Sequence, residues 1–549
     1  MSKQILHGKE AREKLLKGLD TVCNAVKVTI GPKGRNWVLE GGYEPTVAND
    51  AGTIAKEIIL KDKIENMGAQ FAKGVIQKTS EKVGGGRTAS AILLQSLVHE
   101  GIKQDDKGMN INLIKKGMQM ACKDITENLK KIARPCETKE QLKQVATIST
   151  ESDELGEVIA EVVHKVGKDG IVTVEEGQTN EITTKFTEGL EFDKGFISPY
   201  MITNEKEEAV YEDVAVLVTD RKIGMFKELV PALEAVVKSG KKDLVIIAED
   251  IEGNALQQCI INKINPQGGF GILAIKAPSF GENKKACLED LAKLVGGTLL
   301  TEQNWAEAME TTKTMRNTPS GTQMLDISIF KDGILGKANK VISTKDTTKI
   351  IEGKGDIKAH IEKLKEKKDK TESKMEQSRL DERIAKLSNS VAIIKVGANS
   401  DKELKYLKLK IEDGVSESKR ALEEGIVPGG DVVFIHGATL KKLDNDEQSI
   451  GYNIVLKAIE APLRQIVING NNSPDVIISK VQNNTHISGY NALTNEIVQD
   501  MFECGIIDAV KVSRTVLENA VSAASMFLTI EGTISEEDDK EPTRRPIEY

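Results

Sequence analysis

Helical sequence patterns occupy both ends of this chain and strand-like runs occupy its middle, an order that constrains the fold more than any single motif. Near each end, apolar residues recur at the spacing of one helix face. They are Ala11, Leu15, Leu16 and Leu19, then Ala458, Leu463, Ile466 and Val467. At 549 residues the chain exceeds one hydrophobic core, so two to four domains are expected. If both ends belong to one helical domain, the middle is an insertion between its halves, which the periodicity permits without proving.

The middle of the chain alternates between short β-branched runs and helical stretches. The runs are Ile171–Val174, Val214–Val218, Leu244–Ala248 and Ile272–Ile275, and the helical stretches include Phe226–Lys238 and Ile251–Ile264. This alternation predicts a sheet covered by helices. The whole chain is therefore expected to be an α+β multidomain protein.

A charged stretch, Gly353–Ser390, follows this centre and is rich in Lys and Glu. Its two apolar stripes are Ile357, Ile361 and Leu364, then Leu380, Ile384 and Leu387. The pattern favours a solvated antiparallel helical hairpin over a partner-binding coiled coil. The acidic segment Glu536–Tyr549 is typical of a frayed tail.

Composition excludes several classes of protein. The chain carries 76 Lys and Arg against 84 Asp and Glu, a net charge of −8, and only 4% aromatic residues. This balance argues against a basic face for nucleic acid and against an aromatic platform for single strands. No apolar stretch suits a membrane span or a signal peptide. The cysteines and histidines are scattered without ligand spacing, so we expect no zinc site, no disulfide framework and a cytoplasmic location.

Three glycine-rich segments are candidates for binding phosphate. The first, Thr29–Asn36, presents Gly31 and Gly34 beside Lys33 and Arg35. Bare glycine N–H groups with positive charge nearby suit an anion. A helix-to-strand turn uses the same residues and is the alternative.

The second segment, Gly84–Thr88, immediately precedes a predicted helix, Ala89–Ile102. Glycines that open onto a helix N-terminus form an anion site, because the first-turn N–H groups and the helix dipole point the same way. The spacing is not that of a Walker loop. The alternative is a flexible loop capped by Thr88.

The third segment, Glu424–Asp431, places two adjacent glycines before an apolar run, and Glu412–Asp413 lies upstream of it. A carboxylate near a phosphate loop could orient water for attack on a γ-phosphate. An acidic residue that begins a helix is the alternative explanation.

The sequence Ala-Val-Lys-Val-Thr-Ile-Gly-Pro-Lys-Gly-Arg-Asn, at Ala25–Asn36, closely resembles the nucleotide loop of group I chaperonins, the GroEL type. Other blocks agree in the same order. They are Glu65–Gln70, Gly195–Tyr200, Ala248–Gly253, Lys276–Gly281 and Glu460–Gln465. The match runs from about residue 5 to about residue 533, so no single loop carries it. By this resemblance the chain is identified as a divergent paralogue within that family.

The resemblance implies a chaperonin ring subunit with three domains. A mainly helical equatorial domain, residues 1–131 and 424–549, would hold the nucleotide. A small intermediate hinge domain would comprise residues 132–187 and 392–423, and an α/β apical domain, residues 188–391, would bind clients. This organisation agrees with the helical ends and α/β centre described above.

The resemblance also implies an ATP site. Asp50 matches an acidic residue near the phosphates, and Asp413 matches the carboxylate that serves hydrolysis when the intermediate domain closes; both are catalytic candidates. The positions that match nucleotide-contacting residues or the phosphate loop are Thr29, Ile30, Gly31, Pro32, Asp50, Gly85, Gly86, Arg87, Thr88, Ala89, Gly430, Asn491 and Asp508.

On the apical side, the resemblance implies a surface for non-native polypeptides and a lid co-chaperonin. The matching positions are Phe196, Tyr200, Met201, Val230, Leu233, Leu256, Ile260 and Ile261. The predicted helix Ile251–Ile264 has apolar residues over a wider arc than one core needs, which leaves some for a partner. Burial of this helix on two sides is the alternative.

The phosphate loop departs from the family pattern G-D-G-T-T-T, because Gly84–Ala89 reads Gly-Gly-Gly-Arg-Thr-Ala. Gly85 stands where an Asp ligates magnesium, and Arg87 and Ala89 stand where hydroxyls contact phosphate. Losing that carboxylate should weaken hydrolysis, so the need for magnesium and the metal ligands stay open. We hypothesise that Arg87 partly replaces the cation, giving nucleotide binding with slow or absent turnover. The rival is an Arg87 side chain turned into solvent.

Two further departures concern assembly. Arg464 is present, but Ser473 replaces an acidic residue that supports ring-to-ring contact, and the family's C-terminal Gly-Gly-Met repeat is absent. We expect a homo-oligomeric ring and doubt a stable second ring, although one lost surface pair is worth too little to decide this. Lys194 and Asp401 match a pair that bridges neighbouring apical and intermediate domains.

The predicted function is that of an ATP-dependent chaperone, which captures non-native proteins and assists their folding or prevents their misfolding. Such a chaperone is a folding isomerase of the stress response. The alternative is a non-hydrolysing, nucleotide-binding holdase or scaffold. Gly85 and Arg87 favour the alternative, whereas Asp50 and Asp413 favour hydrolysis. The sequence shows no Ser/His/Asp, Cys/His or metal-ligand cluster that would support an unrelated α/β enzyme.

Overall fold

The computed structural model describes residues 3–40, 45–105, 107–168, 170–177, 179–264, 270–279, 281–318, 321–371, 373–388 and 390–536. The chain forms two compact units. The first comprises Met1–Lys168, Val174–Ile182 and Val396–Tyr549, and the second Asp169–Thr173 and Thr183–Lys395. Within the described ranges, no helix is long and apolar enough to cross a membrane.

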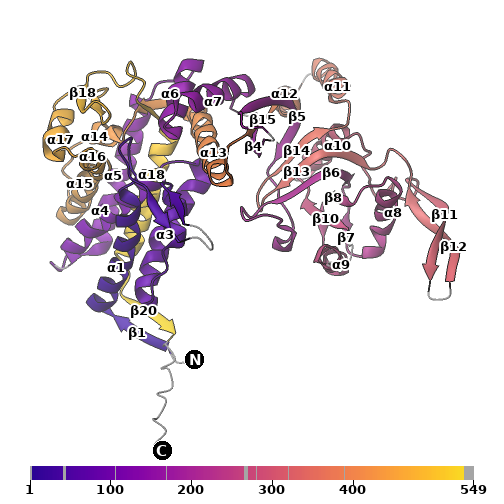
Figure 1. The fold of residues 1–549 in the computed structure, drawn as a ribbon, viewed down its shortest axis with the longest axis horizontal. Coiled ribbons are helices and arrows are strands. Elements are labelled where there is room, and N and C mark those ends of the chain that lie inside the picture. Colours follow the sequence, from indigo (N-terminus) through magenta and orange to yellow (C-terminus); the bar gives the residue numbers. More distant parts are fainter. Residues whose placement is uncertain are drawn as a thin grey trace, which may run out of the picture. The chain divides into compact units, whose positions relative to one another are not determined.

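Helices from both chain ends build the first unit (Figure 1). Its N-terminal part contains β1 (Lys3–His7), α1 (Gly8–Lys27), β2 (Trp37–Leu39), β3 (Thr46–Ala48), α2 (Ala51–Glu57), α3 (Lys63–Val83), α4 (Arg87–Asp105), α5 (Ile111–Ile132), α6 (Lys139–Thr150) and α7 (Asp153–Val166). Its C-terminal part contains α13 (Asp401–Glu424), β16 (Ile426–Pro428), α14 (Val432–Gly437), α15 (Asp446–Ala458), α16 (Ala461–Asn469), α17 (Pro474–Gln482), β17 (Gly489–Asn491), β18 (Glu496–Val498), β19 (Ile507–Ala509), α18 (Val510–Phe527) and β20 (Gly532–Glu536). Helix α18 packs against α3, α4 and α5, and β1 pairs with β20, so the two ends share one unit.

Local sequence signals determine where these helices begin and how closely they pack. The Asp62 carboxylate caps α3 by accepting the N–H groups of Ile64 and Glu65. Helices α1 and α3 meet at a glycine: a Cβ on Gly18 would lie 1.7 Å from the carbonyl oxygen of Glu65. The missing side chain therefore lets the two helix backbones approach each other.

An eight-stranded sheet is the framework of the second unit, in the order β10-β8-β6-β13-β14-β5-β15-β4. Its strands are β4 (Ile171–Glu176), β5 (Thr183–Phe192), β6 (Ala209–Val218), β8 (Asp243–Ala248), β10 (Gly271–Lys276), β13 (Gly336–Ser343), β14 (Thr348–Gly353) and β15 (Ser390–Val396). The other elements of this unit are η1 (Pro199–Met201), β7 (Lys222–Ile223), η2 (Phe226–Glu228), α8 (Val230–Lys238), β9 (Asp250–Ile251), α9 (Gly253–Ile264), α10 (Glu282–Val295), β11 (Met309–Thr318), β12 (Gly321–Phe330), α11 (Ile357–Asp369) and α12 (Lys374–Ser388). Strands β6, β8 and β10 are parallel.

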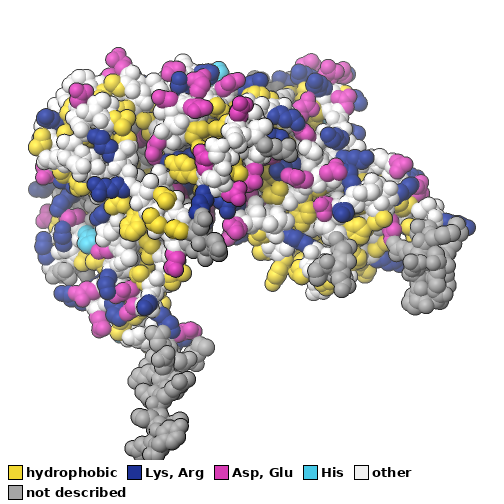
Figure 2. Space-filling view, in the orientation of Figure 1, with side chains coloured by type: hydrophobic (Ala, Val, Ile, Leu, Met, Phe, Trp, Pro, Cys, Tyr) yellow, Lys and Arg dark blue, Asp and Glu magenta, His cyan; other side chains and the backbone are white. Residues whose placement is uncertain are grey.

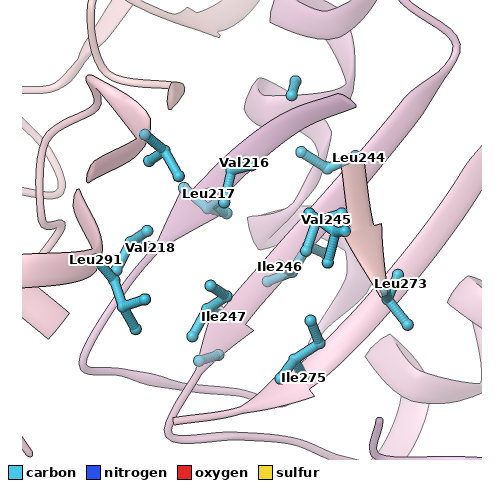
Figure 3. Packing of buried hydrophobic residues seen from close by; sticks show 14 of the residues in the cluster. Val216, Leu217, Val218, Leu244, Val245, Ile246, Ile247, Leu273, Ile275 and Leu291 are labelled. Atoms are coloured by element: carbon cyan, nitrogen blue, oxygen red, sulfur yellow. The ribbon is translucent and has the colours of Figure 1, made fainter. Parts of the chain in front are cut away.

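The core of the second unit lies on these parallel strands. Figure 3 shows side chains of β6, β8 and β10, among them Val216, Ile246 and Ile275, packed in one cluster with Leu291 of α10. All four side chains are fully buried. Parallel strands buried on both faces are continuous β-branched runs in sequence, which explains why the pattern revealed them.

The predicted strands of the centre and one of the two predicted helices are confirmed, with shifted ends. The four predicted strands lie in β4, β6, β8 and β10. Ile251 belongs to β9, so the predicted helix over this segment begins at Gly253. The single helix predicted over Phe226–Lys238 is wrong: η2 ends at Glu228, and α8 begins at Val230 with Pro231 in its first turn, where a missing N–H costs no helical hydrogen bond.

The predicted charged hairpin is confirmed as two helices, α11 and α12, and its apolar stripes face inward. The buried members are Ile357, Leu364, Leu380 and Leu387. Asp290 of α10 joins both helices, because its carboxylate contacts His360 Nε2 at 2.7 Å and accepts hydrogen bonds from the Arg383 guanidinium at 2.7 and 2.8 Å. Of the predicted tail, Glu536 ends β20 and the rest lies outside the described residues.

Candidate functional site

The loop Gly84–Gly86 leads directly into α4. Gly84 and Gly86 have φ angles of 83° and 71°, which glycine adopts readily and other residues rarely do. Helix α4 begins at Arg87, two residues earlier than predicted, and the Ser90 N–H donates to the Gly86 carbonyl at 3.0 Å. The predicted cap Thr88 therefore lies inside the helix. Backbone N–H groups of the first turn and the dipole of this long helix suit an anion here.

Arg87 joins two acidic residues that are far apart in sequence. Its Nη2 donates to Asp413 Oδ1 at 2.6 Å, and its Nη1 donates both to Asp413 Oδ2 at 3.1 Å and to Asp50 Oδ1. Its Nε donates to Ser80 Oγ at 2.9 Å. The structure thus brings the two catalytic candidates together around one guanidinium at the start of α4.

Two sequence-based alternatives are excluded by this arrangement. The Arg87 side chain is only 15% exposed, so it is not turned into solvent. Asp413 lies in the middle of α13, so the start of a helix does not explain it. Asp50 does cap a helix, since its Oδ2 accepts the Thr53 N–H at 2.7 Å and the Thr53 hydroxyl at 2.9 Å.

The environments of the two carboxylates push their pKa values apart. Burial raises the pKa of Asp413 to about 6 against the attraction of Arg87. Burial also opposes the charge of Asp50, but Arg87 and the two Thr53 donors outweigh it and hold the pKa of Asp50 below its ordinary value. Asp413 is therefore the carboxylate that more readily exchanges a proton near neutral pH.

Glu417, one turn after Asp413 on α13, is a site residue that sequence reasoning missed. A Cβ built on Gly85 would lie 1.5 Å from Glu417 Oε1, so this carboxylate occupies the side-chain space of position 85. Burial, with Asp508 and Asp413 nearby, raises the pKa of Glu417 to about 8, against a hydrogen bond from Ser149. The available signal was the i, i+4 spacing of two acids, which places both on one helix face.

The third glycine segment wraps the carboxylate of Asp508. Strands β16 and β19 pair Val427 with Asp508, and the N–H groups of Gly430 and Asp431 donate to the Asp508 carboxylate. Burial raises the pKa of Asp508 to about 6 and, with Asp508 nearby, that of Asp431 to about 8. A Cβ on Gly430 would meet no atom within 4 Å, so this glycine borders open space.

The loop Thr29–Pro32 is held by a hydrogen bond within its own turn and by one from α16, and Asn491 is held by its own turn. The Thr29 hydroxyl donates to the Val26 carbonyl at 2.8 Å, and Asn469 Nδ2 donates to the Ile30 carbonyl at 3.0 Å. The Asn491 side-chain oxygen accepts the Leu493 N–H at 2.9 Å. Their predicted contacts with a nucleotide stay predictions.

The acidic residues fit a divalent cation only in partnership with phosphate. Carboxylate oxygens are the protein ligands that Mg²⁺ prefers, and nucleotide-bound Mg²⁺ needs just one or two of them. In the described part of the chain, no three Asp, Glu, His or Cys residues are arranged to hold a metal ion by themselves. Asp50 and Asp413 are engaged with Arg87, whereas Glu417 receives a hydrogen bond from a neutral hydroxyl.

The predicted client surface is only partly accessible. Phe196, Met201 and Leu233 belong to the core of the second unit, so their prediction as surface residues is wrong for this conformation. Tyr200 and Ile261 are 68% and 55% exposed. The half-buried members are Val230, Leu256 and Ile260.

Sequence reasoning also missed exposed apolar residues beside this surface. They are Met225, Val237 and Ile264. Figure 2 shows hydrophobic side chains at the surface in the region of α9, the helix that carries Ile261 and Ile264. The alternative that α9 is buried on two sides is therefore wrong.

Of the residues predicted to touch neighbouring subunits, Arg464 has acidic partners within this chain. Arg464 donates to Asp475 Oδ1 at 2.6 Å and to Glu460 Oε2 at 3.1 Å. Ser473 occupies the N-cap position of α17, where its side chain makes no capping hydrogen bond. The predictions about rings, and about Lys194 with Asp401, stay predictions.

Comparison with known proteins establishes the fold. Residues 22–538 match the TCP-1/cpn60 chaperonin family. The structure is similar to that of the chaperonin gp146 from the bacteriophage EL 2 (Pseudomonas aeruginosa), crystallised in the presence of ATP-BeFx, with a TM-score of 0.67 and 19% sequence identity over 97% of this chain and 99% of that one. The predicted α+β chaperonin fold is confirmed, while its division into three domains stays a prediction. The chain belongs to the TCP-1/cpn60 chaperonin family.

Proposed function

We propose that this chaperonin binds ATP where the Gly84–Gly86 loop, the start of α4 and α13 meet, and that nucleotide controls its capture of non-native proteins. The observation that carries the proposal is the convergence of Asp50, Arg87 and Asp413 on this loop. The family and the phage chaperonin crystallised with ATP-BeFx support a chaperone role and a nucleotide ligand.

In this account the N–H groups at the start of α4 receive phosphate oxygens, and Arg87 neutralises the two carboxylates that would otherwise repel them. Asp413 orients the attacking water, for which its oxygens must leave the Arg87 guanidinium. Turnover is consequently slow, because each cycle breaks a bidentate ion pair. Bound magnesium would spread the negative charge of the phosphates.

Client capture would use the exposed apolar residues around α8 and α9. Tyr200, Met225, Ile261 and Ile264 are each more than half exposed, as a surface for non-native chains requires. A homo-oligomeric ring and a lid co-chaperonin complete the proposal. The ring follows from the family, and the co-chaperonin from the resemblance at the apical positions.

The second candidate function is a holdase that binds nucleotide without hydrolysing it. One observation favours it: Arg87 engages both carboxylates that hydrolysis would need. Such a protein would suppress client aggregation whether or not ATP turns over.

Three assays on the purified full chain separate these functions. We would measure binding of a fluorescent ATP analogue, phosphate release, and light scattering by a guanidinium-denatured test protein. The proposal expects nucleotide binding, slow phosphate release and scattering that ATP modulates. Absence of nucleotide binding would defeat it, and binding without phosphate release would establish the holdase.

A further inference from the structure

We propose that Glu417 supplies, from α13, the cation-binding carboxylate of the phosphate loop, and that Gly85 and Glu417 work as one exchanged pair. The inference rests on the proposed nucleotide function of this site. It assigns a role to Glu417, which is not among the site residues predicted from the sequence.

The geometry of position 85 is the first observation. A Cβ there would lie 1.5 Å from Glu417 Oε1, 2.5 Å from Cδ and 2.9 Å from Cγ, so the end of the Glu417 side chain fills this space. Gly84 and Gly86 have positive φ angles, which explain why these two positions are glycines. The φ angle of Gly85 is not positive, so its backbone conformation does not call for glycine. Gly85 therefore leaves room for the end of the Glu417 side chain, which would have to shift if position 85 carried a Cβ.

One hydrogen bond fixes α13 at the start of the loop, and a second holds the Glu417 side chain. The Ser416 hydroxyl donates to the Val83 carbonyl at 3.2 Å, immediately before the three glycines. A hydrogen bond from Ser149 of α6 holds the Glu417 carboxylate. Glu417 is thus held beside the start of α4, where phosphate would bind, by groups that carry no charge.

The charges around Glu417 indicate what it binds. Asp413 on its own helix and Asp508 on β19 lie near enough to raise the pKa of Glu417, and Arg87 on α4, which donates hydrogen bonds to Asp50 and Asp413, lowers it. Burial and these acids favour the protonated form of Glu417, so a cation that binds there displaces its proton. Because the described residues offer no complete metal site, that cation has to arrive with phosphate oxygens as its other ligands.

This inference makes a prediction opposite to the hypothesis that Arg87 replaces the cation. If Glu417 binds the cation, nucleotide affinity depends on a divalent metal, and the metal binds only together with nucleotide. If Arg87 replaces the cation, nucleotide affinity is independent of the metal. If Glu417 binds the cation, Gly85→Asp alone should weaken metal and nucleotide binding, because the new side chain collides with Glu417.

The test uses the full chain, Mn²⁺ and ADP, with free Mn²⁺ measured by electron paramagnetic resonance, so that no turnover is needed. In parallel, a fluorescent ADP is titrated with and without Mg²⁺. The variants are Glu417→Gln, Gly85→Asp and the double variant Gly85→Asp/Glu417→Ala, with exposed Glu140→Ala on α6 as the matched control. Circular dichroism checks that each variant is folded.

We expect Glu417→Gln to weaken Mn²⁺ binding in the presence of ADP on the order of tenfold or more. Glu140→Ala should match the wild type, Gly85→Asp should lose binding, and the double variant should recover it because it moves the carboxylate back to the loop. Wild-type Mn²⁺ affinity retained by Glu417→Gln, or a double variant no better than Gly85→Asp, overturns the inference while the nucleotide function stands. A wild type that binds no ADP at any metal concentration overturns both.

Discussion

Replacing Arg87 by alanine tests whether this guanidinium holds the site together. In the wild type it donates three hydrogen bonds to two carboxylates, and a fourth to Ser80. Arg87→Ala leaves Asp50 and Asp413 facing each other without a cation. Both carboxylates then lose the attraction that offsets their withdrawal from water.

The size of the effect follows from burial. The side chains of Arg87, Asp50 and Asp413 are 15, 25 and 22% exposed, so solvent screens the ion pairs only in part. Breaking a buried pair by removing one partner costs about 3–5 kcal/mol. For a chain of this size, the thermal midpoint of the first unit should fall on the order of 5 °C at pH 7.5.

The loss should shrink as the pH falls. Without Arg87 the pKa of Asp413, already about 6, rises further in the folded state above its unfolded value. A carboxyl with a raised folded pKa binds a proton on folding, so lowering the pH stabilises the folded form. While the pH lies between the unfolded and the folded pKa of Asp413, each unit by which it falls restores about 1.4 kcal/mol of the lost free energy of unfolding. Between pH 7.5 and 5.5 roughly half of the penalty should disappear.

Differential scanning calorimetry at several pH values provides the measurement. Lys139→Ala is the control, because the Lys139 and Glu157 side chains are 44 and 46% exposed and such a pair is worth about 0–1 kcal/mol. If Arg87→Ala lowers the midpoint no more than Lys139→Ala, or if its penalty is the same at pH 5.5, the electrostatic reasoning is refuted.

Three further predictions concern packing, pH and client capture. Gly85→Ala should lower the thermal midpoint because its Cβ collides with Glu417, whereas Gly74→Ala in mid-α3 meets no atom within 4 Å and should stabilise the chain by about 0.5–1 kcal/mol in the same calorimetric scan. Asp431→Asn should raise the midpoint at pH 8 and not at pH 4, because the pKa of Asp431 is raised to about 8 in the folded state and its stabilising proton is lost as the pH rises. Ile261→Asp should weaken capture of a denatured test protein, read by light scattering, without changing the midpoint, since its side chain is largely exposed.

The fold was predictable where a pattern is local. The strands β6, β8 and β10 are continuous β-branched runs because they are buried on both faces, and periodicity alone finds them. The boundary at Pro231 was also present in the sequence, since proline prefers the first turn of a helix. The union of both chain ends, as in the pairing of β1 with β20, depends on tertiary contacts that periodicity only permits.

The site residues were predictable where they stand at positions that match the family's nucleotide site. Asp50, Arg87 and Asp413 were named by comparison with the family that the sequence resembles, and the structure brings them together. Glu417 was missed because its role depends on the empty side-chain space of Gly85, which lies more than three hundred residues away in sequence. Phe196 and Met201 were misjudged because an apolar residue has the same identity whether it faces a client or the core.

Two properties proposed for this site are ATP binding and a turnover limited by the ion pair between Arg87 and Asp413. Both are tested by steady-state phosphate release by the wild type and by Arg87→Thr, with nucleotide binding measured on the same samples. We expect that both bind ATP, Arg87→Thr more weakly because Asp50 and Asp413 are no longer neutralised, and that Arg87→Thr releases phosphate faster because Asp413 is free to orient water. A wild type without nucleotide binding, or an Arg87→Thr variant that hydrolyses no faster, would contradict the proposal.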